Sequence, residues 1–252
     1  MTVQHPKARK LIEIIIKKKT NLCVSADVVT SQELIELVHA VGPYVCMIKT
    51  HIDIITDFNK DLIHKLKSLS FQYEFLLFED RKFADLGSTV LRQFSQGIYN
   101  INSWADFINA HIIVGPGIVS GLRSVSEGQA LILIAQMSAA GNLCNEVYTK
   151  EAVKIAEQNQ DFVCGFICTE SVSDNKNFIS FVPGVHLSSA GDKLGQQYVS
   201  PECAINKGAD VVIVGRGIYS AKDMAIAAKE YRDSSFNAYN KLRSDTNVKL
   251  SS

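Results

Sequence analysis

Eight short apolar segments recur along the chain of 252 residues, and this repetition constrains the fold more than any other feature. Most of the segments are continuous in hydrophobicity and do not alternate with polar residues, which is typical of strands buried on both faces of a parallel sheet. The expected strands lie at residues 21–27, 44–50, 74–80, 104–112, 131–138, 162–169, 178–185 and 209–217.

Segments with helical periodicity lie between most of these strands. The expected helices lie at residues 31–41, 60–70, 88–98, 149–159 and 220–242. Ser31, Thr149 and Ser220 are candidate N-caps, because each precedes a periodic segment and an acidic residue follows at or near the capping-box position. Between the sixth and seventh strands there is room for at most one helical turn, and the residues after 242 are expected to fray.

The alternation of eight strands with helices predicts the α/β class and a (β/α)₈ TIM barrel, with residues 1–252 forming a single domain. The structural alternative is an open, doubly wound sheet, which usually has fewer strands and a glycine-rich turn after the first of them. Residues 25–31, which include the end of the first strand and the turn after it, contain no glycine, and this favours the barrel.

The composition excludes several classes of function. Lysine and arginine together number 26, as do aspartate and glutamate, so no basic footprint for nucleic acid or anionic membrane is visible. No apolar run approaches the roughly 20 residues that span a bilayer, and the N-terminus lacks the apolar region of a signal peptide. The six cysteines lack zinc-ligand spacing and are expected to be buried, reduced thiols of a cytoplasmic protein.

Polar and charged residues stand at the carboxyl ends of consecutive expected strands. Barrel enzymes hold their catalytic groups at this face, so these residues are candidates for a functional site. They are Asp27, Lys49, Thr50, His51, Asp80, Arg81, Lys82, Asp85, Asn109, His111, Ser138, Pro183, Gly184, Gly215, Arg216 and Gly217.

The end of the eighth strand, residues 215–217, has the chemistry of an anion site. Its two glycines let backbone amides approach an anion, and Arg216 offers a fork of donors. Barrels often bind phosphate with the loops after strands seven and eight, and residues 191–198 add glutamine and tyrosine donors. We therefore expect a phosphate site, the alternative being a tight turn with a surface arginine. Residues 115–117, Gly-Pro-Gly, are expected to form a simple turn.

The stretch FEDRKFADLGSTV, residues 78–90, places charges directly after a buried strand. Asp80 and Lys82 would point to one side of the extended chain, with Lys49 on the neighbouring strand and Asp85 following. Flanking carboxylates would keep Lys82 charged, so that it could protonate a carbanion, while Asp80 would repel a substrate carboxylate. This array suits decarboxylation. Two alternatives remain open, namely a buried ion-pair network and a metal site with Asp80 and Asp85 as ligands.

These motifs resemble the eukaryotic branch of the orotidine 5′-phosphate decarboxylase family. The similar stretches are FEDRKFADLGSTV, KTHIDI (49–54), SWADFINAH (103–111), GDKLGQQY (191–198) and VIVGRGI (212–218), and the resemblance extends over about residues 20–240. It implies a barrel enzyme that converts orotidine 5′-phosphate to UMP and CO₂, the last step of de novo pyrimidine biosynthesis. No metal or organic cofactor is implied.

The resemblance also implies a role for each site residue. Lys82 would protonate carbon 6 of the pyrimidine and Asp80 would crowd the substrate carboxylate. Asp85 would complete the array from the neighbouring subunit, so that active sites are shared within a homodimer. The other residues implied to bind substrate are Asp27 and Lys49 at the ribose with Thr50 and His51 beside them, Thr89 from the neighbouring subunit, Leu86, Pro183 and Ser138 at the base, Gln196 between base and phosphate, and Tyr198, Gly215 and Arg216 at the phosphate.

One departure from the family pattern stands next to Ser138. Gln136 occupies a position at which an acidic residue before methionine is commoner. The resemblance also leaves open whether the chain is a separate enzyme, as in fungi, or a domain of a bifunctional UMP synthase.

Two other functions deserve comparison. Barrel enzymes acting on keto-sugar phosphates share the Asp-x-Lys-x-x-Asp pattern and use Mg²⁺, but they would not need Ser138 and the loop 191–198 to bind a uracil edge. A catalytically inactive protein that senses UMP would be expected to lack Lys82 or an aspartate of the array, and all four charged residues are present. The sequence therefore favours the decarboxylase.

Overall fold

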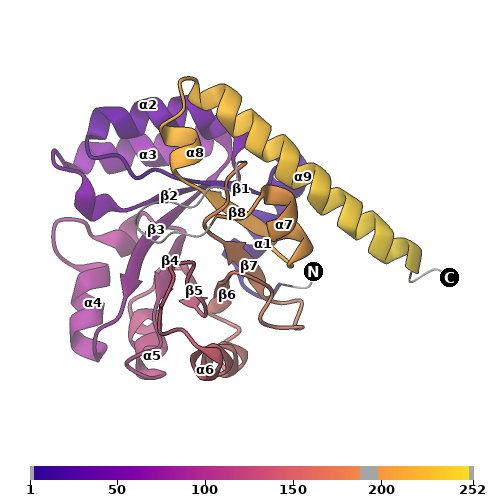
Figure 1. The fold of residues 1–252 in the computed structure, drawn as a ribbon. Coiled ribbons are helices and arrows are strands. Elements are labelled where there is room, and N and C mark those ends of the chain that lie inside the picture. The colour runs from indigo at the N-terminus through magenta and orange to yellow at the C-terminus, as the bar shows by residue number, and fades with distance from the viewer. Residues whose placement is uncertain (1–2, 188–197, 250–252) are drawn as a thin grey trace.

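Eight parallel strands form a closed barrel, hydrogen-bonded in chain order from β1 to β8 and closed by the pairing of β8 with β1 (Figure 1). The computed structural model describes residues 3–187 and 198–249. The strands are β1 (Leu22–Ser25), β2 (Met47–Thr50), β3 (Leu76–Phe83), β4 (Phe107–Ala110), β5 (Ala130–Ile134), β6 (Val163–Ile167), β7 (Ile179–Val182) and β8 (Val211–Val214). The predicted α/β barrel is thereby confirmed.

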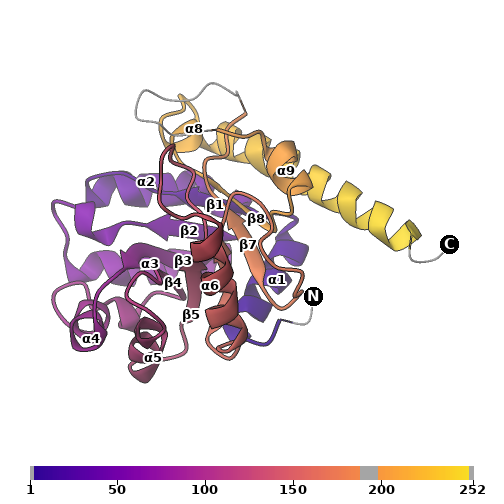
Figure 2. The ribbon, with the colours of Figure 1, turned by 60° about the horizontal axis from the view of Figure 1, so that its bottom comes forward.

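Helices surround the barrel, and the second half of the long C-terminal helix projects beyond it (Figures 1 and 2). The α-helices are α1 (Pro6–Lys18), α2 (Ser31–Val41), α3 (Lys60–Tyr73), α4 (Gly87–Ser95), α5 (Gly117–Ser124), α6 (Glu146–Glu157), α7 (Pro201–Asn206), α8 (Arg216–Tyr219) and α9 (Met224–Lys249), and the 3₁₀ turns are η1 (Gly42–Tyr44), η2 (Ile52–Ile54) and η3 (Ile101–Ser103). None of the helices within the described ranges is long and apolar enough to cross a bilayer.

Each of the eight predicted strands is present, but β3 continues to Phe83 instead of ending at residue 80. The chain between β6 and β7 forms no helix, as predicted. Four α-helices were not predicted. The sequence of α1 is charged and was compared only with a targeting segment. The helices α5 and α7 are short and begin with a glycine and a proline, which weaken the helical pattern, and α8 has four residues and begins inside the expected eighth strand. Residues 115–117 thus lead directly into α5.

The three predicted N-caps were wrong. The side chains that accept hydrogen bonds from the first turns of α2, α6 and α9 belong to Thr30, Asn145 and Asp223. At Thr30 the cap is a full capping box, because Glu33 in turn accepts from the Thr30 amide. The fraying expected after residue 242 was also wrong, since α9 continues to Lys249.

The barrel interior below the strand ends is solid. Phe107 of β4 and Phe181 of β7 are fully buried and meet edge to face, with ring centroids 6.2 Å apart. Because β4 and β7 are not neighbours in the barrel, this contact spans the interior. Gly165 brings β6 close to β7, since a Cβ there would lie 2.1 Å from the Ile179 carbonyl oxygen. The packed floor fixes the strand ends that carry the polar residues.

Lys18, at the end of α1, ties three segments together. Its ammonium donates to the carbonyls of Gly42 at 2.9 Å, Val45 at 2.6 Å and Tyr73 at 2.6 Å. These carbonyls follow α2, precede β2 and end α3, respectively. Burial lowers the pKa of Lys18 to about 8, but three carbonyl acceptors satisfy its donors.

We expect Lys18→Met to lower the free energy of unfolding by about 2–4 kcal/mol, because three part-buried carbonyls lose their donor while the aliphatic volume is kept. Lys17→Met is the matched control. Lys17 is exposed and pairs with Glu74 on the surface, so its loss should cost less than about 1 kcal/mol. Urea denaturation measures both variants, and equal effects would contradict the role assigned to Lys18.

Candidate active site

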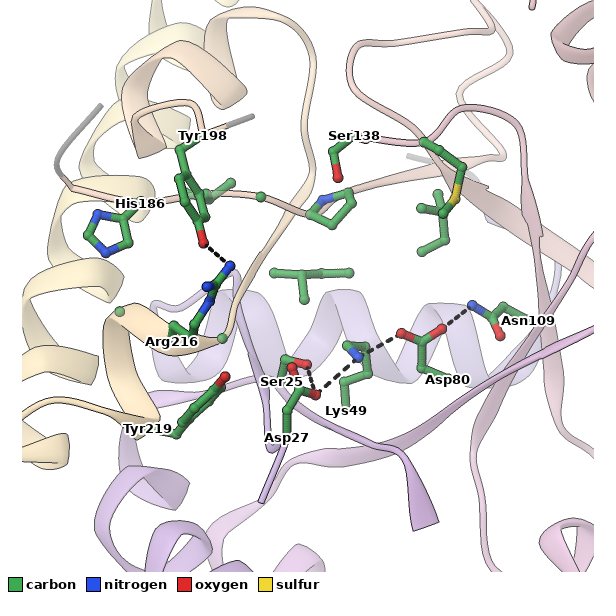
Figure 3. Close-up of a pocket in the computed structure, with 18 of the residues that line it drawn as sticks. Ser25, Asp27, Lys49, Asp80, Asn109, Ser138, His186, Tyr198, Arg216 and Tyr219 are labelled. Carbon is green, nitrogen blue, oxygen red and sulfur yellow. Dashed lines mark hydrogen bonds and ion pairs between the residues drawn. The ribbon is translucent and has the colours of Figure 1, made fainter. Parts of the chain in front are cut away.

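A cavity of about 320 Å³ opens at the carboxyl ends of the strands (Figure 3). Twelve predicted site residues line it, namely Asp27, Lys49, Asp80, Lys82, Asn109, Ser138, Pro183, Gly184, Tyr198, Gly215, Arg216 and Gly217. Figure 3 shows Arg216 and Tyr198 at one end of the cavity and Asp80 and Asn109 at the other. The polar strand ends therefore converge as the parallel barrel requires.

Asp80 lies between two ammonium groups. One carboxylate oxygen is 2.6 Å from the Nζ atom of Lys49, and the other is 2.7 Å from that of Lys82. Lys49 also lies 3.7 Å from Asp27. The side chains of Lys49 and Asp80 are only 7% and 10% exposed, whereas that of Lys82 is 35% exposed and reaches the open cavity. Three members of the predicted array, Lys49, Asp80 and Lys82, thus meet within one chain, and Asp27 adjoins them through Lys49.

The charged groups of the array stabilise one another's ionised forms. Burial alone would raise the pKa of Asp80, but Lys49 and the neighbouring His51 and Lys82 outweigh burial and hold it well below its usual value. Burial likewise opposes the charge on Lys49, but Asp80 and Asp27 together raise its pKa. Both groups therefore stay ionised across the physiological pH range.

His51 completes the contact with Lys49. Its Nε2 atom lies 2.9 Å from the Lys49 Nζ atom and 3.3 Å from Asp80. The same ring nitrogen is therefore close to both members of the Lys49–Asp80 pair.

Thr50 faces away from the cavity. Its hydroxyl donates to Glu79 at 2.7 Å, and the Ile52 amide donates to the same carboxyl group at 3.1 Å. Glu79 was not singled out from the sequence. It is fully buried, no cation of the described residues forms an ion pair with it, and burial raises its pKa to about 8. These bonds fix the end of β2, which carries Lys49, and the start of the following loop, which carries His51.

Asp85, Leu86 and Thr89 lie outside this chain's own cavity, at and before the start of α4. Asp85 accepts hydrogen bonds from the Leu86 amide at 2.7 Å and from Gln93 at 3.4 Å. The Leu86 side chain is 67% exposed, and Thr89 is also exposed. Asp80 and Asp85 do not converge, and no group of three or more potential metal ligands gathers in the described ranges.

The far end of the cavity carries donors suited to an anion. Arg216 donates to the Tyr198 hydroxyl at 2.6 Å, and the His186 ring packs on that of Tyr198. Gly217 has a structural reason to be glycine, because a Cβ there would lie 2.1 Å from the Tyr231 hydroxyl. Gln196, predicted to join base and phosphate, lies outside the described residues.

Gln136, which stands where an acidic residue was expected, has a clear structural role. Its side-chain oxygen accepts from the Thr169 amide and hydroxyl, both at 2.9 Å, and from the Glu170 amide at 3.4 Å. A carboxylate could accept the same three bonds, so glutamine keeps the connection between the loops after β5 and β6 without a charge. Ser138 follows two residues later and lines the cavity.

The sequence reasoning missed several lining residues. They are Ser25, Met137, Ile167, Val185, His186, Ile213 and Tyr219. Ser25 could have been found, because it lies two residues before Asp27 on β1 and donates to it at 2.6 Å. His186 and Tyr219 follow β7 and β8 and carried no signal of their own.

Glu79 should make stability depend on pH. Its pKa is raised from 4.5 to about 8 on folding, so the folded protein holds an extra proton between these pH values and loses stability as pH rises. We expect the stability of Glu79→Gln relative to wild type to increase by about 2–4 kcal/mol from pH 5 to pH 8, measured by urea denaturation.

Glu33→Gln is the control for this experiment. Hydrogen bonds from Thr30 and the Val29 amide lower the pKa of Glu33, so the stability that Glu33 adds is lost only at pH values below its usual pKa, and the difference between Glu33→Gln and wild type should stay nearly constant from pH 5 to pH 8. A pH-independent difference between Glu79→Gln and wild type would contradict the assignment.

Relatives of known activity cover nearly the whole chain. The model of the orotidine 5′-phosphate decarboxylase / HUMPS family matches residues 20–231. The orotidine 5′-phosphate decarboxylase of Phycomyces blakesleeanus is 48% identical over 244 residues, which are 94% of this chain and 91% of that protein. That of Saccharomyces cerevisiae is 46% identical over 248 residues, covering 94% and 93%. Uridine 5′-monophosphate synthase of Bos taurus is 48% identical over 93% of this chain, which spans 50% of the bovine protein.

Solved structures agree on the fold. The orotidine 5′-monophosphate decarboxylase of Methanocaldococcus jannaschii in complex with the inhibitor BMP superimposes with a TM-score of 0.67 at 20% identity, over 88% of this chain and 99% of that one. The enzyme of Pyrococcus horikoshii gives 0.66 at 23% identity, over 85% and 98%. With a matching barrel, a family match over most of its length and fungal relatives near half identity, this chain belongs to the orotidine 5′-phosphate decarboxylase / HUMPS family.

Proposed function

We propose that the protein decarboxylates orotidine 5′-phosphate to UMP and CO₂, the last step of de novo pyrimidine biosynthesis, in the cytoplasm and without a cofactor. The observation that carries the proposal is the Asp80 carboxylate held between Lys49 and Lys82 at one end of a cavity whose other end carries Arg216. A carboxylate and an ammonium side by side suit the removal of CO₂ and the addition of a proton at one carbon.

In the proposed reaction the substrate phosphate lies at Arg216, Tyr198 and Gly215, with Gln196 between phosphate and base. The pyrimidine lies between Ser138 and Pro183, and Asp27 and Lys49 bind the ribose hydroxyls. The bond between carbon 6 and the carboxylate breaks, and its electron pair stays on carbon 6. Lys82 then transfers a proton from Nζ to carbon 6, and water restores the proton to Lys82.

Phosphate binding contributes to this reaction although the phosphate does not react. Contacts at Arg216 and Tyr198 hold the base against the array, so that the binding free energy of a remote group supports the chemical step. The solid barrel floor below the site keeps the two ends of the cavity at a fixed separation.

We further propose a homodimer in which Asp85 and Thr89 of each subunit enter the other subunit's cavity. Two observations support this arrangement. Asp85 does not line its own cavity, and the neighbouring Leu86 is 67% exposed. The loops after β2 and β4 also expose apolar side chains, with Ile54 39% and Ile113 70% exposed. A second subunit would cover such side chains.

The first test follows the ultraviolet absorbance of orotidine 5′-phosphate in the presence of EDTA. We expect turnover by wild type and a loss of at least about a thousandfold in Lys82→Ala, because the proton donor is missing. Lys17→Ala, a change of an exposed lysine distant from the cavity, should leave the rate unchanged. If orotidine 5′-phosphate is not turned over without Mg²⁺, or if keto-sugar phosphates are turned over with Mg²⁺, the protein would instead be a Mg²⁺-dependent enzyme of sugar phosphates.

Shared active sites predict complementation between two inactive variants. In a mixed dimer of Lys82→Ala and Asp85→Asn, one cavity carries both changes and the other carries neither. Random exchange of subunits should therefore restore about one quarter of wild-type activity, since half of the dimers are mixed and each has one intact site. If Asp85 acted in its own chain, mixing the variants would restore nothing.

A further inference from the structure

Lys82 has an unusual backbone conformation. Its φ angle is 49°, in the left-handed region that residues with a side chain rarely adopt. Among the other described non-glycine residues with positive φ, Lys19 and Glu74 follow the last residues of α1 and α3, where this conformation is common, and Asn100 lies in the loop before η3. Lys82 is inside a strand, so its conformation needs a local cause and points to function.

The cause is a bulge between β3 and β4. Glu79 pairs with Ile108 and Phe83 pairs with Ala110, so residues 80–82 of β3 stand opposite the single residue Asn109 of β4. The bulge places Asp80 and Lys82 toward the cavity but removes the ladder partner of the Lys82 amide. The side chain of Asn109 replaces that partner, because its Oδ1 atom accepts from the Lys82 amide at 2.7 Å.

The other half of the same carboxamide binds the charge array. The Nδ2 atom of Asn109 donates to Asp80 Oδ1 at 2.7 Å, and the Lys82 ammonium donates to that same oxygen at 2.7 Å. Asn109 is fully buried. Its orientation is fixed by its partners, since the backbone N–H requires an acceptor and the carboxylate requires a donor.

We propose that Asn109 is the positioning residue of the Lys82–Asp80 pair, holding the strained backbone of the proton donor with one end and the carboxylate with the other. The inference rests on the proposed function in that Lys82 and Asp80 are the reacting groups. Asn109 itself would neither give a proton nor bind the phosphate. Its loss should lower the rate of the chemical step and leave binding of the nucleotide almost unchanged.

Asn109→Asp separates positioning from mere packing. Protonated aspartate has the same shape and the same donor and acceptor as asparagine, whereas ionised aspartate repels Asp80. We expect the ratio of the variant's kcat to that of wild type to fall at least about tenfold as pH rises from 5.5 to 8, as the added carboxyl group ionises. A constant ratio across this range would overturn the proposal.

Asn109→Ala removes both bonds. We expect kcat to fall about a hundredfold, because the ammonium loses its fixed position, while the dissociation constant of UMP changes less than about threefold. The control is Asn102→Ala, which removes a buried asparagine before β4 whose amide donates to the Val125 carbonyl. A similar loss of kcat in both variants would mean that Asn109 acts only through packing.

A third measurement needs no turnover and therefore separates this proposal from the proposed function. With Asn109 present, residue 82 is held left-handed, so Lys82→Gly should melt about 2–4 °C above Lys82→Ala. When Asn109 is replaced by alanine, the chain can relax and the advantage of glycine should vanish. If Lys82→Gly melts above Lys82→Ala by the same amount with and without Asn109, then Asn109 does not hold the backbone of residue 82. This outcome would refute the proposal whether or not the protein decarboxylates orotidine 5′-phosphate.

Discussion

The structure of the site depends on one buried carboxylate, that of Asp80. It accepts from Lys49, Lys82 and Asn109, which come from β2, β3 and β4. A buried carboxylate is costly unless such donors are in place, and long side chains from distant segments would lose much entropy on being fixed. Neighbouring strands of a closed barrel bring them together with little additional ordering, because the packed interior already fixes the strand ends.

This network is not explained by stability. Replacing a buried ion pair by apolar residues is often neutral or stabilising, so the two ammonium groups and two carboxylates of this cavity are weak candidates for holding the barrel together. The departures from local rules also gather here. Glu79 is a buried carboxyl group with which no cation of the described residues forms an ion pair, and Lys82 has a left-handed backbone inside a strand. Such costs are concentrated at functional sites, where the surrounding structure sustains them.

The strands and the polar strand ends could be predicted because both follow from period and topology. Continuous apolar runs indicate parallel strands, and parallel strands in a barrel must end on one face. The bulge could not be predicted, since nothing in the letters of residues 78–83 shows that three residues stand opposite one. Glu79 was missed for a related reason. Alternation places it on the outer side of β3, but does not show that this side is completely buried beneath the helices.

In the proposed reaction, negative charge moves from the side of the array that carries Asp80 to the side that carries Lys82. Within one chain, the charges of Lys49 and Lys82 balance those of Asp27 and Asp80, so the substrate carboxylate adds one negative charge. Loss of CO₂ does not remove this charge but moves it from a group beside Asp80 to carbon 6 beside Lys82. A rigid array therefore repels the charge where it starts and attracts it where it arrives, which is differential stabilisation of the transition state. In the proposed mechanism a mobile Lys82 could follow the charge to either place and would lose this difference. A strained backbone that holds Lys82 in one position would preserve it.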